Sequence, residues 1–171
     1  MLHRRLALLG LATAATASLT PQLVQAQTAQ RLSPTEHTAM TLMAGSLSKQ
    51  TSELAQERAQ SRAVKLFAGF EVAEQAAIAQ VLTDVANPPD VPLDAEHAAV
   101  LKNLQGLTGA AFDGAYVQAQ LLGHEKLLAI QQGYLDNPAR TPDGQHIAVL
   151  ARANIQQHLV MLKELQRTLA G

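Results

Sequence analysis

The chain of 171 residues contains no cysteine, and aromatic side chains make up only 3% of it. Without cysteine the protein can form neither disulfide bonds nor thiolate metal sites, and it has no cysteine nucleophile. The scarcity of aromatic residues, which favour strands, disfavours a β-sheet core. We therefore expect a helical fold that is stabilised by packing alone.

The chain also lacks an excess of charge of one sign, because it contains 13 Lys and Arg residues and 14 Asp and Glu residues. No basic cluster offers a surface for nucleic acid or for an anionic membrane. The sequence also lacks a Gly-x-Ser-x-Gly elbow, a phosphate-binding glycine loop, a His-Glu-x-x-His zinc helix and a dinucleotide fingerprint. We expect no nucleic-acid partner and no enzyme of these classes.

The first 26 residues have the pattern of a secretory signal peptide. Arg4 and Arg5 precede an apolar run over residues 6–19, and Val24-Gln25-Ala26 fits a small-x-small cleavage site. The run is shorter than the roughly 20 residues that a membrane-spanning helix needs, so a cleaved signal is favoured over a transmembrane anchor. The predicted mature protein, residues 27–171, is a single domain in the periplasm or associated with the outer membrane. Sec and twin-arginine export both stay open.

The mature region is rich in Ala, Leu, Gln and Glu, which favour helices. Start and stop signals divide it into four main helices and one short helix. The first main helix begins at the capping box Ser33-Pro34-Thr35-Glu36 and ends at a turn at 60–62. The second follows this turn and stops at Asn87-Pro88-Pro89. The short helix covers 94–104, the third main helix covers 110–135, and the last runs from Thr141-Pro142 to 169. These segments predict an antiparallel four-helix bundle with a short extra helix before the third main helix.

The spacing of apolar residues predicts which helix faces are buried. On the first helix, the expected apolar stripe consists of Leu42, Leu47, Leu54 and neighbouring alanines. His124 and His158 interrupt apolar stripes on the last two main helices, so both should point into the core. Because these helices run antiparallel across a short turn, the two imidazoles should lie at nearly the same level. The other histidines of the mature region lie near helix starts and are expected at the surface: His37, His97 and His146.

Two interpretations of the histidine pair stay open at this point. In the first, His124 and His158 belong to a structural polar network with Asp113 and Tyr116, because buried imidazoles need hydrogen-bond partners. Asp113 would cap the first turn of its own helix. The Tyr116 ring would lie in the core with its hydroxyl group on a polar partner. This interpretation assigns no catalytic residue.

In the second interpretation, His124 and His158 bind a single transition-metal ion together with a carboxylate from the second helix, Glu71 or Glu74. Glu53 on the first helix is a further candidate. The Glu-x-x-His spacing of di-iron bundles does not occur in the chain. A mononuclear site, of an atypical kind, is therefore the metal site that the sequence leaves open, and no other cofactor is expected.

Several motifs resemble those of a known family. They are Phe112-Asp113-x-x-Tyr116, Gln118-Ala119, Gly123-His124-Glu125 and His158, with Leu54-Ala55-x-Glu57-Arg58-Ala59 and Val64-Lys65-x-Phe67-Ala68 at the first turn. In these motifs the chain resembles the bacterial domain-of-unknown-function family 4142. The resemblance implies an exported protein with a ferritin-like helical bundle and no settled activity. Where the family often has a glutamate in the first helix and an Asp-His pair in the second, this chain has Gln50 and Glu74-Gln75.

These patterns predict an exported, soluble bundle of ferritin-like topology that acts as a non-enzymatic periplasmic binding protein or in the envelope stress response. The alternative is a metal-binding or redox bundle built on His124 and His158. The expected partner is an envelope protein or a second copy of the chain.

Overall fold

The computed structural model describes residues 31–171 of the chain. The predicted signal peptide, residues 1–26, lies outside the described residues, so export stays a prediction. Within residues 31–171 the chain forms five helices and no strand. They are α1 (Pro34–Arg58), α2 (Arg62–Ala86), α3 (Ala95–Gln105), α4 (Gly109–Leu135) and α5 (Pro142–Ala170).

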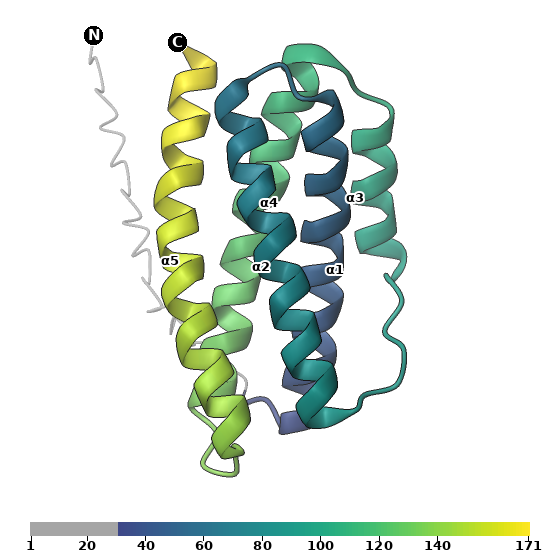
Figure 1. Ribbon diagram of the computed structural model, residues 1–171. Coiled ribbons are helices and arrows are strands. Elements are labelled where there is room, and N and C mark those ends of the chain that lie inside the picture. Colours follow the sequence, from purple (N-terminus) through teal and green to yellow (C-terminus); the bar gives the residue numbers. More distant parts are fainter. Residues whose placement is uncertain (1–30) are drawn as a thin grey trace, which may run out of the picture.

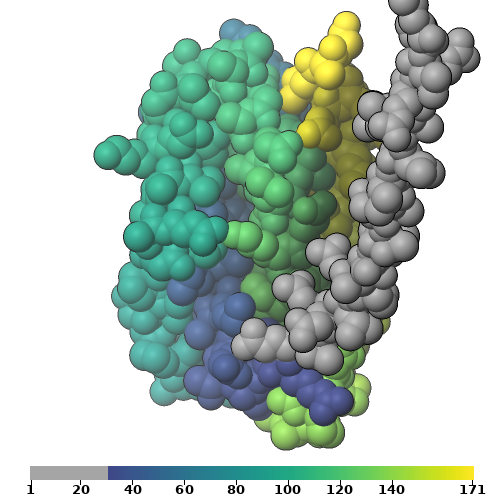
Figure 2. Space-filling model, turned by 180° about the vertical axis from the view of Figure 1, so that it is seen from behind, coloured from purple at the N-terminus to yellow at the C-terminus, as the bar shows by residue number. Residues whose placement is uncertain are grey.

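The long helices pack as two antiparallel hairpins, α1 with α2 and α4 with α5 (Figure 1). The connection from α2 to α4 carries α3 and returns along the length of the bundle, so that α2 and α4 run in the same direction (Figure 1). This arrangement confirms the predicted all-helical four-helix bundle with a short extra helix before the third main helix. Figure 2 shows the face on which α3 lies beside α4, with α1 largely behind them.

The helix ends follow local signals in the sequence. Ser33 and Glu36 form the capping box at the start of α1. Asn87 ends α2 in the left-handed region, with φ 42°, and two prolines follow it. Thr108 precedes α4 as predicted, but its side chain makes no capping hydrogen bond. The boundaries were therefore predictable to within about two residues, the usual uncertainty of helix ends.

The buried face of α1 differs from the prediction, because it is polar. None of the predicted leucines of α1 is among its buried residues, which are His37, Thr38, Thr41, Gly45, Ser48, Thr51, Ser52 and Ala55. His37 is only 1% exposed, so the expectation that it lies at the surface is wrong. Small hydroxyl residues permit close approach of α1 to its neighbours, and they bring hydrogen-bonding groups into the interior.

Two apolar clusters lie on either side of the polar middle of the bundle. One includes Phe67, Phe112 and Leu162, near the turn between α1 and α2. The other includes Leu127 and Ile155, toward the turn between α4 and α5. Burial of these side chains supplies most of the driving force for folding. In the described part of the chain, no helix has an apolar stretch long enough to cross a membrane.

Candidate functional site

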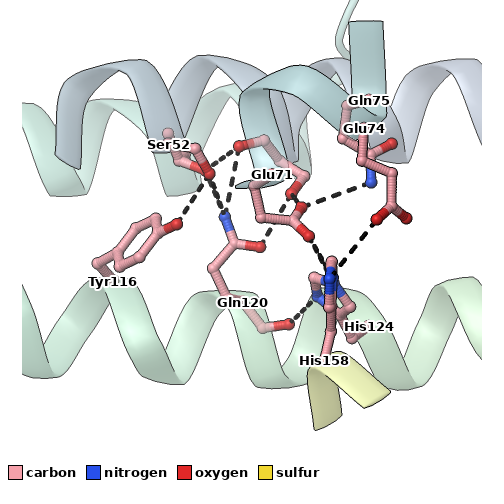
Figure 3. A network of polar contacts seen from close by, with 10 residues as sticks. Ser52, Glu71, Glu74, Gln75, Tyr116, Gln120, His124 and His158 are labelled. Atoms are coloured by element: carbon pink, nitrogen blue, oxygen red, sulfur yellow. Dashed lines mark hydrogen bonds and ion pairs between the residues drawn. The ribbon is translucent and has the colours of Figure 1, made fainter. Parts of the chain in front are cut away.

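Four helices converge on a cluster of polar side chains near the middle of the bundle (Figure 3). Glu71 comes from α2, His124 from α4 and His158 from α5, and their exposed fractions are 0%, 1% and 7%. From α1, the Ser48 hydroxyl group donates a hydrogen bond to Glu71 Oε2. Residues that are far apart in the sequence therefore meet in one water-shielded place.

Three atoms of this cluster form a small triangle. His124 Nε2 lies 3.1 Å from Glu71 Oε1, His158 Nδ1 lies 2.6 Å from the same oxygen, and the two nitrogens are 3.3 Å apart. We call these residues the Glu71 triad. The structure thus places the two histidines at the same level, and it adds Glu71, one of the candidate carboxylates.

The other polar atom of each triad member is held by a further group. His124 Nδ1 lies 2.8 Å from the backbone oxygen of Gln120. His158 Nε2 lies 3.5 Å from Glu74 Oε2. Glu71 Oε2 accepts from Ser48 and, at 3.4 Å, from the side-chain amide of Gln75. Since both atoms of each group have a partner, the rings and the carboxylate are fixed in orientation.

The contact to Gln120 decides the tautomer of His124. A backbone carbonyl oxygen only accepts hydrogen bonds, so His124 Nδ1 carries the proton and donates it to Gln120. In the neutral ring, Nε2 is then the bare nitrogen, and its lone pair points to Glu71 Oε1 and His158 Nδ1. A proton on His158 Nδ1 satisfies this lone pair. The same position would suit a cation.

Burial and charge act in opposite directions on the triad. Burial alone would raise the pKa of Glu71, but its contacts with His124, His158 and Ser48 outweigh it and hold that pKa below its ordinary value of 4.5. Burial alone would lower the pKa of His158, but its contact with Glu71 and the charge of Glu74 raise it above 6.5. Below the raised pKa of His158, Glu71 and His158 therefore form an ion pair in the interior.

Glu74 lies at the edge of the cluster. Its side chain is 17% exposed and makes a single long ion pair with His158. Burial raises the pKa of Glu74, and the negative charge of Glu71 raises it further. Of the two carboxylates proposed from the sequence, Glu71 therefore lies in the triad, whereas Glu74 contacts only the outer nitrogen of one histidine.

A chain of hydrogen bonds continues from the triad along α1. Ser48 Oγ lies 2.9 Å from Gln120 Oε1. Gln120 Nε2 donates to the backbone oxygen of Ser48 at 3.4 Å and to Ser52 Oγ at 3.2 Å. Ser52 Oγ lies 2.8 Å from the Tyr116 hydroxyl group, which places that hydroxyl on a polar partner as expected. Sequence reasoning missed Ser48, Ser52 and Gln120. The available signal was the helical spacing of Thr41, Ser48 and Ser52, which matches that of a buried stripe.

Asp113 has a different role from the one predicted. Its Oδ1 accepts from the backbone N–H of Gln60 at 3.1 Å, and its Oδ2 accepts from that of Ser61 at 2.8 Å. Asp113 therefore holds the turn between α1 and α2 instead of capping its own helix. It shares none of these contacts with Tyr116, His124 or His158. Glu53 pairs with Lys49 at the surface and takes no part in the cluster.

The triad could hold one metal ion after a small rearrangement. In a tetrahedral site, metal bonds of about 2.0–2.2 Å from nitrogen and oxygen place neighbouring ligand atoms about 3.3–3.6 Å apart. One side of the triangle lies in this range, at 3.3 Å, and a second, at 3.1 Å, is slightly shorter. The third, at 2.6 Å, has hydrogen-bond length and would have to lengthen by about 0.7 Å. Within residues 31–171, Glu71, His124 and His158 form the one group of three metal-ligand side chains whose donor atoms are this close together.

Comparison with known proteins shows a family and no close relative of known function. No curated protein and no solved structure matches the chain. The profile of one family matches residues 19–165, which include every member of the Glu71 triad and all five helices in whole or in large part. The chain therefore belongs to the family described as "Domain of unknown function (DUF4142)".

Proposed function

We propose that this bundle binds a single divalent transition-metal ion through Glu71 Oε1, His124 Nε2 and His158 Nδ1. The observation that carries the proposal is the triangle of these three atoms, in which each residue's other polar atom is tied to a different partner. Metal-binding histidines almost always donate their second N–H to a carbonyl or carboxylate group. Both histidines of the triad have such a partner.

The donor set indicates the class of ion. Two imidazoles and one carboxylate are the ligands of catalytic zinc sites and of non-haem ferrous sites. Magnesium and calcium prefer shells made of oxygen atoms only, and cuprous ions prefer sulfur. Zinc or ferrous iron is therefore the ion that this set would select.

A proton takes the place of the ion in the metal-free protein. With His158 protonated, its Nδ1–H fills the centre of the triangle and balances the charge of Glu71. A metal ion must displace this proton, because only the deprotonated imidazole is a ligand. Metal affinity should therefore fall as the pH drops below the raised pKa of His158.

Three protein ligands leave at least one position of a four-coordinate shell open. The cavity of about 20 Å³ beside His124 does not supply that position, because neither Glu71 nor His158 lines it. Binding of the ion is therefore the function that the geometry supports, without any assigned reaction.

The place of action follows from the sequence alone. The predicted signal peptide supports a role outside the cytoplasm, where the protein would hold its ion as a binding protein of the cell envelope. Cell fractionation with an antibody against the bundle tests this part separately. Recovery of the protein with an intact residue 1–26 segment in the cytoplasmic fraction would contradict it.

Titration calorimetry of the metal-stripped protein with zinc, and anaerobically with ferrous iron, tests the metal site. We expect one ion per chain, and an ion concentration of about 100 times the Kd should stabilise the fold by about 2.7 kcal/mol. His158→Gln and Glu71→Gln keep hydrogen-bonding groups in the core while removing a ligand, so both should lose at least about hundredfold in affinity.

The control is His146→Ala, because His146 is exposed on α5 and makes no contact with the triad. Its affinity should equal that of the wild type. Circular dichroism must show that every variant is folded. The proposal fails if the folded wild type binds neither ion, or if His158→Gln and Glu71→Gln bind as tightly as His146→Ala.

A further inference from the structure

A third buried histidine, His37, lies near the opposite end of α1 from the α1–α2 turn. His37 Nε2 is 2.7 Å from Gln131 Oε1, and the amide nitrogen of Gln131 donates to Thr41 Oγ1 at 3.1 Å. The amide oxygen of Gln131 thus faces His37, and its nitrogen faces Thr41. The Tyr134 ring stacks on the imidazole with centroids 4.0 Å apart.

These contacts leave one nitrogen of His37 without a partner. Because Gln131 Oε1 can only accept, His37 Nε2 carries the proton and Nδ1 is the bare nitrogen. Burial lowers the pKa of His37, and its neutral partners do not reverse this effect, so the ring stays neutral at pH 7. Among the described residues, Nδ1 makes no hydrogen bond.

The position of Nδ1 follows from a second observation. In residues 31–171, no fully shielded side-chain nitrogen or oxygen lacks a hydrogen-bond partner. An unpartnered Nδ1 must therefore be in contact with open space, although His37 as a whole is only 1% exposed. His37 lines a cavity of about 540 Å³, and we assign the exposed Nδ1 to the wall of this cavity.

The cavity lies where the first turn of α1, the end of α2 and the start of α5 meet. We call it the His37 cavity. Apolar side chains form much of its wall: Leu82, Val85, Ala86, Pro88, Pro89 and Val91. A volume of this size is typical of small-molecule sites, in which an apolar lining surrounds one or two polar groups that fix the orientation of the ligand.

We infer that the His37 cavity binds a small, neutral and largely apolar molecule whose single hydroxyl or N–H group donates a hydrogen bond to His37 Nδ1. An anion is disfavoured because no Lys or Arg lines the cavity and Asp143 carries its one carboxylate. The Tyr134 hydroxyl group is already used, since it accepts from the backbone N–H of Thr141 at 2.9 Å. The acceptor groups of Asn87 and Asp143 belong to exposed side chains, so His37 Nδ1 is the ring acceptor left for a ligand at the buried wall of the cavity.

The test compares phenol with anisole, which has the same ring and no donor. Binding is followed by NMR on the complete protein with chelator present, so that the Glu71 triad stays metal-free. We expect phenol to bind and to shift the ¹⁵N signal of His37 Nδ1. Anisole should bind about tenfold more weakly, because one hydrogen bond to a buried acceptor is worth about a factor of ten.

Two variants on α2 show whether the cavity is the site. Ala86→Phe places a ring at the exposed rim of the cavity and should abolish phenol binding. Ala76→Phe makes the same change at an exposed position that does not line the His37 cavity, and it should leave phenol binding unchanged. Equal affinity for phenol and anisole, no phenol binding at millimolar concentration, or unchanged binding by Ala86→Phe would each overturn the inference.

Discussion

His158 and His37 are both buried in this bundle, and yet the pKa of one is raised and that of the other is lowered. The partners of His158 are the carboxylates of Glu71 and Glu74. The partners of His37 are an uncharged amide and an aromatic ring. Burial disfavours the imidazolium at both places, so the charge of the partner decides the outcome.

One helix bundle can thus hold two kinds of polar interior. The Glu71 triad is charged, and its atoms converge on a point that suits a proton or a metal ion. The pair of His37 and Gln131 is neutral, and it leaves the lone pair of His37 Nδ1 open to a cavity. Removing a charge from the triad should therefore change the free energy of unfolding by a different amount from removing the hydrogen bonds of His37 and Gln131.

The largest effect is expected when the charged partner is removed. Glu71→Ala leaves His158 and Ser48 without their shared acceptor, and breaking a buried ion pair in this way costs about 3–5 kcal/mol. Urea unfolding of the metal-free protein measures the free energy of unfolding. Glu53→Ala, which breaks only an exposed pair with Lys49, is the control and should cost less than about 1 kcal/mol. If both variants lost a similar free energy of unfolding, the buried pair of Glu71 and His158 would be no more important for stability than the exposed pair of Glu53 and Lys49.

Removing the neutral hydrogen-bond partner of His37 should lower the free energy of unfolding by less than removing Glu71. Gln131→Met keeps the volume of a fully buried side chain but removes the hydrogen bonds to His37 and Thr41. We expect a loss of about 1–3 kcal/mol in the same urea experiment, the cost of leaving neutral groups unsatisfied. Gln118→Met, at an exposed position of the same helix, should change stability by less than about 0.5 kcal/mol. A loss for Gln131→Met as large as that for Glu71→Ala would break the comparison.

A smaller effect is expected at the edge of the charged cluster. Because burial already raises the pKa of Glu74, its replacement by the neutral Gln should cost about 1 kcal/mol or less. Its contact with His158 Nε2 orients that ring, so Glu74→Gln should still weaken zinc binding by about 10–100-fold. Calorimetry and urea unfolding on the same sample separate the two effects. Unchanged zinc affinity would show that Glu74 does not position His158.

The finest test is the pH dependence of the metal-free protein. The folded pKa of His158 is raised above 6.5, so its stabilising contribution is complete below that pH and is lost as the pH rises through the raised value. The folded pKa of His37 is lowered, so its contribution is complete above 6.5 and is lost as the pH falls toward the lowered value. The stability difference between wild type and His158→Gln should therefore shrink above pH 6.5, and that between wild type and His37→Gln should shrink below it.

NMR titration of the ring protons in the presence of chelator checks these directions residue by residue. In Glu71→Gln the pKa of His158 should drop, whereas that of His37 should not change, because Glu71 is not one of its partners. Titration of both histidines on the same side of 6.5 would contradict the account of the two sites.

Much of the fold was predictable because its signals are local. The capping box at Ser33, the prolines after Asn87 and the Thr141-Pro142 start each act within a few residues, so they could be read directly from the sequence. The pairing of His124 with His158 also needed only a short turn between two antiparallel helices.

The interior of α1 could not be predicted in the same way. Hydropathy favours leucines over hydroxyl residues as core positions, so the buried Ser48 and Ser52 and the buried His37 were missed. Their burial depends on partners from α4, namely Gln120, Tyr116 and Gln131. Such contacts are tertiary and have no local signature. Asp113 was misassigned for the same reason, because the N–H groups that it accepts from lie in a different turn.

The polar face of α1 has a consequence for how the bundle assembles. Three hydrogen-bonded pairs join α1 to α4 at successive levels: His37 with Gln131, Ser48 with Gln120 and Ser52 with Tyr116. Two smooth apolar helices can slide past each other by one turn of about 5.4 Å and still bury similar area. Here such a slip would break all three pairs at once. The register of α1 against α4 is thereby restricted to one value, which keeps Ser48 of α1 at the level of Gln120 and so within one turn of His124.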